Sequence, residues 1–140
     1  GHNDLEEGEV REYATPQEML DDFGIKGQLI PAEVPEEFGA PTCWASNDES
    51  GLKLENLYES QGNYLYFRYK QISKESTMSI EKDSRSAIYW DCADIYHYQM
   101  TDNGIEKITW INGDFECRAS SNVTGEELRQ IVESIYEGEK

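Results

Sequence analysis

The residues that could carry chemistry in this chain are three cysteines, two histidines and many carboxylates. Cys43, Cys92 and Cys117 form no Cys-x-x-Cys pair, so neither a zinc ribbon nor a thioredoxin-like redox motif is indicated. His97 with Cys117 or Cys92 would be the pair for a metal site or for a nucleophile activated by a base. Because Trp110 is expected beside His97, a packed and hydrogen-bonded imidazole is the favoured interpretation.

Three cysteines permit at most one internal disulfide. The strand register expected below puts Cys92 on the order of 20 Å from Cys117. A disulfide tolerates about 7 Å between Cα atoms, so this pairing is disfavoured and Cys117 is predicted to be a buried thiol. A bridge from Cys43 to either of the other two stays open.

Carboxylates such as Asp91 and Asp94 occur in pairs, and the acidic composition alone accounts for such pairs. The segment "SNDESG", residues 46–51, lacks calcium-loop spacing because Ser46 stands where an acid is needed, so a solvated turn is expected. There is no G-x-S-x-G elbow, no H-E-x-x-H and no P-loop. We therefore expect a non-enzyme with no catalytic residues, no metal site and no cofactor.

Four tyrosines are the candidate interaction surface. Tyr64 and Tyr66 share one face of their predicted strand, and Tyr96 and Tyr98 share the sheet face opposite the one expected to carry the helices. Tyrosine suits an interface because its ring is apolar and its hydroxyl is polar. The competing interpretation is a second core layer or ordinary cross-strand packing.

Length and charge limit the classes of partner. The chain has 140 residues, enough for one domain with a real core, and its net charge of -17 is spread along the sequence. Such a field repels phosphate, so no nucleic acid and no anionic lipid surface is expected as a partner. No stretch is apolar enough to cross a bilayer, and no signal peptide is seen. Gly1 without a preceding Met indicates a processed or engineered start. A removed signal peptide, lipoprotein leader or membrane helix would each fit, and membrane association is expected only through such an N-terminal anchor.

The N-terminal half predicts one helix and a pair of strands. Residues 1–14 are expected to be an acidic lead-in or tether, followed by a single domain over 15–138. "TPQEMLDDFG" predicts a helix, with Thr15 as cap, Pro16 in the first turn and Gly24 at the exit. The three prolines of residues 28–44 predict an extended, interrupted segment. Strands are expected over 52–60 and 63–72 around Gln61-Gly62, then a shorter strand over 76–82 and a loop over 82–87.

The C-terminal third predicts a registered antiparallel sheet. Asn103-Gly104 and Asn112-Gly113 are two-residue hairpin signals, which would pair Gln99 with Ile108 and Ile108 with Cys117. One face would be the core, made of Ile95, His97, Ile108, Trp110, Phe115, Cys117 and Ala119. The other would carry Tyr96, Tyr98, Met100, Lys107, Thr109, Glu116 and Arg118.

A final helix is predicted to cover the core face. Thr124 and Glu127 form a capping box, and Leu128, Ile131, Val132 and Ile135 repeat at helical spacing. The fold class that follows is α+β, with a curved antiparallel sheet of about six to eight strands and an N-terminal and a C-terminal helix packed on one face.

The C-terminal residues resemble a known family. The strand with Trp110, the turn at Asn112-Gly113, Phe115 on the return strand and "SNVTGEELRQIVESI" are similar to the signature of domain of unknown function 4367. The matched helix positions are Glu126, Glu127, Leu128, Ile131, Ser134 and Ile135. The resemblance covers roughly the last third of the chain.

That resemblance implies a cellular location and the kind of protein in which the domain occurs. Such domains commonly lie outside the membrane of Gram-positive bacteria, after a membrane helix in anti-sigma-factor-like proteins, or in lipoproteins and secreted proteins. Their curved sheet looks like the half-barrel of lipoprotein carriers. No catalytic residues are established for the family, and the sigma-binding part is absent from this chain.

Two functions are therefore expected, in this order. The first is a non-catalytic extracytoplasmic sensing or protein-interaction domain of a membrane-anchored or secreted bacterial protein, which recognises an unknown protein through its tyrosine-bearing face. The alternative is a carrier that holds a lipid or other apolar ligand between sheet and helices. A carrier needs an unfilled apolar cavity, whereas an interaction module needs a packed core and an exposed aromatic patch.

Overall fold

A computed structural model describes residues 5–72 and 87–137 of the chain. The predicted strand over 76–82 and most of the loop after it lie outside these residues. The elements are β1 (Val10–Tyr13), α1 (Pro16–Asp22), a 3₁₀ turn (Glu36–Phe38), β2 (Thr42–Asp48), β3 (Gly51–Ser60), β4 (Asn63–Gln71), β5 (Ile88–Cys92), β6 (Ile95–Asp102), β7 (Ile105–Asn112), β8 (Phe115–Ser121), α2 (Gly125–Glu133) and a second 3₁₀ turn (Ser134–Tyr136).

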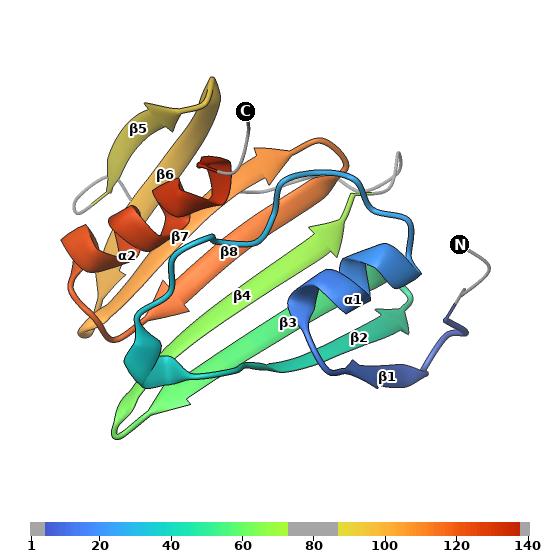
Figure 1. Ribbon diagram of the computed structural model, residues 1–140. Coiled ribbons are helices and arrows are strands. Elements are labelled where there is room, and N and C mark those ends of the chain that lie inside the picture. The colour runs from blue at the N-terminus through green and yellow to red at the C-terminus, as the bar shows by residue number, and fades with distance from the viewer. Residues whose placement is uncertain (1–4, 73–86, 138–140) are drawn as a thin grey trace.

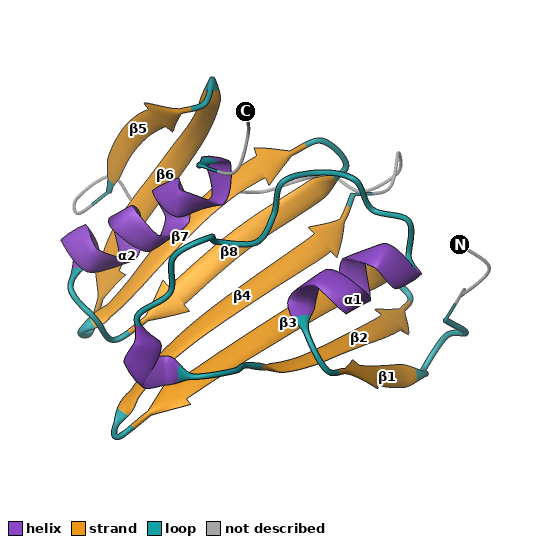
Figure 2. Ribbon diagram, in the orientation of Figure 1, coloured by secondary structure: helices purple, strands orange, loops and turns teal. Residues whose placement is uncertain are grey.

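The eight strands form one antiparallel sheet in the order β1-β2-β3-β4-β8-β7-β6-β5. The sheet is curved and does not close, and both α-helices and the long segment between α1 and β2 lie on the same side of it (Figures 1 and 2). The other side, which we call the open face, carries no helix of the described residues. This confirms the α+β prediction of a curved sheet with its two helices on one face.

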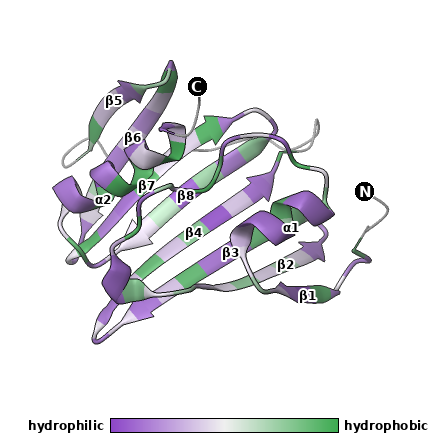
Figure 3. Cartoon of the chain, viewed as in Figure 1, coloured by the Kyte–Doolittle hydropathy of each residue, from purple (hydrophilic) through white to green (hydrophobic). Residues whose placement is uncertain are grey.

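The core lies between the sheet and the helices. Residues alternate in hydropathy along the strands, as half-buried strands require (Figure 3). The helix stripe predicted from the sequence is buried, with Leu128 and Val132 at 0% exposure and Ile131 and Ile135 below 6%. The Thr124 hydroxyl oxygen accepts the backbone N–H of Glu127 at 3.1 Å, which fixes the start of α2.

The predicted acidic lead-in contributes a strand to the sheet. Val10–Tyr13 pairs with Ser46–Cys43 of β2 and forms one edge. Exposed and half-buried residues alternate along this strand. Tyr13 lies on the core side of the sheet and packs edge-on against Phe23, with 6.0 Å between ring centroids. The expectation of a tether over 1–14 is therefore wrong for residues 10–13.

Two further strands differ from the sequence prediction. β2 begins directly after Pro41, the last of the three prolines, and continues through Asp48, so the expected turn narrows to Glu49-Ser50. β5 reaches β6 through a tight turn at Ala93-Asp94, where both residues have positive φ. Such a turn normally has Asn or Gly there, so its sequence signal is missing.

One hairpin has a different register from the expected one. The β6–β7 pairing of Gln99 with Ile108 is confirmed. In the β7–β8 hairpin, however, Ile108 pairs with Ala119 and not with Cys117. The turn residues are Gly113-Asp114, with positive φ at Gly113, and Asn112 stays in the strand, where its Nδ2 donates to the carbonyl oxygen of Gln28 at 2.7 Å. A two-residue shift preserves the predicted faces.

Candidate functional site: the open face of the sheet

The open face is built by every second residue of each strand. Register places Tyr96 and Tyr98 on it, as expected, and it places Tyr64 and Tyr66 on the same face of the sheet. The two pairs are separated by β8 and β7, so three strand spacings, about 14 Å, lie between them. The four tyrosines therefore share a face without forming one cluster.

The two pairs have different surroundings. Tyr66 donates its hydroxyl to Glu55 Oε2 at 2.5 Å, and Trp44 Nε1 donates to the other oxygen of that carboxylate at 3.1 Å. Burial, together with the bond to Glu55, raises the pKa of Tyr66. This part of the face is a fixed hydrogen-bonded layer.

The second pair belongs to a more exposed aromatic cluster. Tyr89 on β5 stacks on Tyr96 at 5.3 Å and contacts Tyr98 at 5.0 Å between ring centroids. Tyr96 is 57% exposed and Tyr89 43%, whereas Tyr98 is buried beneath them. We call Tyr89, Tyr96 and Tyr98 the tyrosine cluster. Tyr89 was missed from the sequence because β5 was not predicted as a strand.

Most of the exposed apolar side chains lie on the same face. Among the described residues, five large apolar or aromatic side chains are exposed: Val10, Ile88, Tyr89, Tyr96 and Ile111. All except Ile88 occupy open-face positions. Val10 lies on β1 at the far edge of the sheet, whereas Tyr89, Tyr96 and Ile111 lie on the neighbouring strands β5, β6 and β7. The open face therefore has the exposed aromatic patch expected of an interaction module.

Positive charge lines the middle of the open face. The three central strands β4, β8 and β7 place four of the eight described lysines and arginines there, namely Arg68, Lys70, Lys107 and Arg118, with Glu116 as their carboxylate neighbour on those strands. Arg68 lies directly opposite Arg118 and forms an ion pair with Glu116 at 3.6 Å. We call these four residues the basic stripe.

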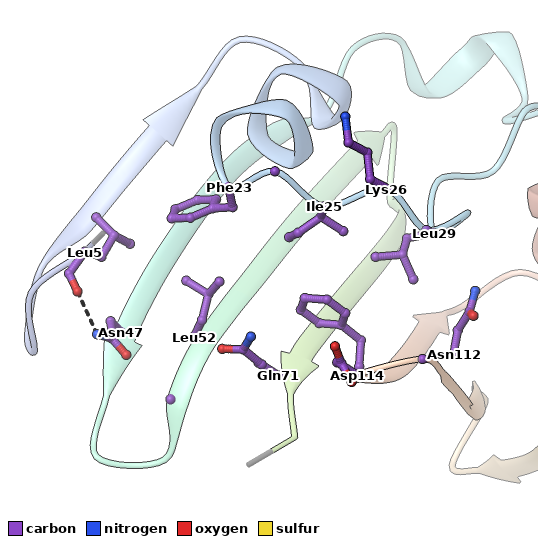
Figure 4. Close-up of a pocket in the computed structure, with 15 residues that line it drawn as sticks. Leu5, Phe23, Ile25, Lys26, Leu29, Asn47, Leu52, Gln71, Asn112 and Asp114 are labelled. Atoms are coloured by element: carbon purple, nitrogen blue, oxygen red, sulfur yellow. Dashed lines mark hydrogen bonds between the residues drawn. The ribbon is translucent and has the colours of Figure 1, made fainter. Parts of the chain in front are cut away.

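A cleft of about 700 Å³ lies on the helix side, beneath the chain that leaves α1. Phe23, Ile25 and Leu52 converge on it in Figure 4. Leu5, Leu29 and Phe115 complete its apolar wall, while Asn47, Gln71, Asn112 and Asp114 supply polar groups. Asn47 Nδ2 is held by the carbonyl oxygen of Leu5 at 2.7 Å.

His97 forms neither a metal site nor a nucleophile–base pair with Cys92 or Cys117. The ring stacks on Trp90 at 4.2 Å, Nδ1 lies 2.9 Å from the carbonyl oxygen of Ile95, and Nε2 lies 2.9 Å from the hydroxyl of Tyr136. Burial lowers the pKa of His97 to about 4. Both ring nitrogens are thus engaged in structural contacts, which confirms the packed-ring interpretation.

The cysteines are free thiols. Burial raises the pKa of Cys117 and raises that of Cys43 to about 11, so neither supplies a thiolate at neutral pH. Within residues 5–72 and 87–137, no group of three or more His, Cys, Asp or Glu could hold a metal ion. Over the same residues, no helix is both long and apolar enough to span a bilayer.

Comparisons with protein-family models, with curated proteins and with solved structures found no match to this chain. The resemblance to domain of unknown function 4367 therefore stays a prediction that rests on the C-terminal residues. Function must be inferred from the two surfaces described above.

Proposed function

We propose that the chain is a non-catalytic interaction domain that binds a protein partner on the open face, in an extracytoplasmic bacterial setting. The observation that carries the proposal is the tyrosine cluster, whose two outer rings are 43% and 57% exposed while the core between α2 and the sheet is buried. Tyr89 and Tyr96 offer large rigid contact areas that lose little conformational entropy on binding. The extracytoplasmic setting is supported only by the family resemblance.

The experiment compares three baits in extracts of the producing cells: the wild-type domain, Tyr89→Ser/Tyr96→Ser, and Gln130→Ser on the exposed side of α2. The expected result is a protein retained by the wild type and by Gln130→Ser but lost with the double variant. Rebinding of the purified partner, with a dissociation constant weakened about tenfold or more by the double substitution, completes the test. Equal retention of the protein by all three baits would show that Tyr89 and Tyr96 on the open face do not bind it.

A second candidate function is carriage of an apolar ligand, which the cleft beneath Ile25 favours. Its volume of about 700 Å³ lies in the range of small-molecule sites, and its apolar wall carries convergent polar groups. It does not lie under α2, where Leu128 and Val132 fill the space. Native mass spectrometry followed by denaturation and organic extraction tests this function. A released apolar adduct that is lost in Leu52→Gln supports carriage, and a clean mass for freshly isolated protein opposes it.

A further inference from the structure

The middle of the open face differs in charge from the rest of the molecule. Its three central strands carry four cations and one carboxylate there, although the open face as a whole carries five of the described cations and seven of the described carboxylates. The chain carries a net charge of -17, yet the basic stripe puts four cations on three adjacent central strands. Outside the open face, the described residues include only Arg11, Lys26 and Arg129 as cations, against 17 of the 24 described carboxylates. The stripe is thus the place where a chain of this composition concentrates positive charge.

The fold offsets only part of the electrostatic repulsion within the stripe, through Glu55 opposite Arg68 on β3 and Glu116 opposite Lys70 on β8. Arg68 and Arg118 are cross-strand neighbours, and like charges directly opposite one another destabilise a sheet. Arg68 Nε is buried without a hydrogen-bond partner, although its guanidinium contacts Glu116. Lys70 and Lys107 flank this pair and are partly exposed. An added carboxylate would reduce the repulsion and offer acceptors to these donors.

At physiological salt, the carboxylates on the helix side of the molecule do not cancel the attraction between the basic stripe and an added carboxylate. A helix with its side chains is about 10–12 Å across, and the Debye length at 0.15 M is about 8 Å. Carboxylates on the outer side of α2 are therefore largely screened at the open face. At short range, the charges that a docked segment meets there are those of the basic stripe and Glu116, with Glu55 opposite Arg68 on β3 and Asp91 opposite Tyr96 on β5 at the two ends of its path.

We infer that the partner presents an acidic segment with an aromatic or apolar residue at one end. Its apolar end packs on Tyr89 and Tyr96, and its carboxylates lie across β7, β8 and β4 on the basic stripe. From β6 to β4 the distance is about 14 Å, which an extended segment of about five residues spans at 3.3 Å per residue. This inference rests on the proposed function and names the chemistry of the partner.

The test is an NMR titration at about 0.15 M salt, with a synthetic peptide of one tyrosine followed by four glutamates. Amide shifts should concentrate on β7, β8, β4 and the tyrosine cluster, and the same peptide with glutamines should produce much smaller ones. Lys107→Glu should weaken binding about tenfold, whereas the matched change Lys26→Glu on the helix side should leave it within about twofold. If Lys107→Glu fails to fold, Lys70→Gln/Lys107→Gln replaces it.

Three results overturn the inference. They are the absence of saturable shifts with the glutamate peptide, equal binding of the glutamine peptide, and equal loss in the Lys107 and Lys26 variants. Shifts centred on Ile25 and Leu52 would assign the peptide to the cleft and count equally against it. A natural partner that still requires Tyr89 and Tyr96 would then leave the proposed function standing with a partner of other chemistry.

Discussion

At the residue scale, His97 shows how a side chain that looks catalytic is used for packing. It is fully buried between Trp90 and Trp110, and Tyr136 links it to the end of the C-terminal helix. A neutral imidazole that donates from Nδ1 to Ile95 accepts at Nε2 from the Tyr136 hydroxyl. Protonation would break the second bond and place a charge in an apolar site.

The first prediction is a loss of stability in mild acid. Burial lowers the pKa of His97 to about 4. The hydrogen bond to the Ile95 backbone and the charges of Glu133 and Asp91 oppose this shift, and the charge of Arg129 adds to it. In the unfolded state His97 binds a proton at about its ordinary pKa of 6.5, well above its folded pKa. The contribution of neutral His97 to folding stability is therefore complete above pH 6.5 and is lost as the pH falls from 6.5 towards 4. The slope should be on the order of 1 kcal/mol per pH unit.

Urea unfolding of the wild type and of His97→Gln between pH 7 and pH 4.5 isolates this effect. The variant is less stable at pH 7, but the difference between the two proteins should shrink as the pH falls. Carboxylate titration contributes equally to both and cancels in the comparison. A difference independent of pH would show that His97 titrates normally in the folded state.

At the element scale, the C-terminal helix closes the core. Leu128 is fully buried against the sheet, and Gln130 is exposed on the same helix. Leu128→Ala should lower the free energy of unfolding by about 3 kcal/mol, because it removes packed methyl groups and leaves a cavity. Gln130→Ala should change it by no more than about 0.5 kcal/mol. Chemical denaturation measures both, and similar values for the two variants would mean that α2 is loosely attached.

The elements that the sequence predicted well are those with both a local signal and a periodic pattern. α1, α2 and the β3–β4 hairpin have caps or turn residues at their ends and alternating or helical apolar positions between them. β5 was missed because Ala93 and Asp94 adopt positive φ without the usual Asn or Gly. The β7–β8 register was predicted wrongly because Asn112 stays in the strand and its side chain donates a hydrogen bond to the backbone of Gln28. No local sequence pattern indicates this long-range contact.

The candidate site was only partly visible in the sequence for the same reason. Alternation was enough to place Tyr96 and Tyr98 on the face opposite the helices. The partnership of Tyr89 and the alignment of Arg68 with Arg118 depend on which strands are neighbours. Strand order is a tertiary property, since β4 pairs with β8 far along the chain. The cleft likewise needs the path of residues 23–29 over the sheet.

At the scale of the whole molecule, the net charge of -17 opposes the compact state through self-repulsion. Five ion pairs are seen among the described residues, and they neutralise a small part of it. Raising NaCl from about 0.02 M to about 0.3 M should therefore stabilise the fold by about 1 kcal/mol, roughly 4 °C in Tm. Calorimetry checks this, with an uncharged solute at equal osmolality as control. A fall in Tm would mean that attractive pairs outweigh the repulsion.

The central claim is that the open face, and not the helix side, meets the partner. The most direct measurement places a photoreactive benzoylphenylalanine at Tyr96 in one protein and at Gln130 in another, and irradiates the producing cells. We expect one discrete crosslinked species from position 96. Position 130 should not give this species, and Tyr89→Ser should reduce its yield. A crosslink from position 130 alone, or the same products from both positions, would contradict it.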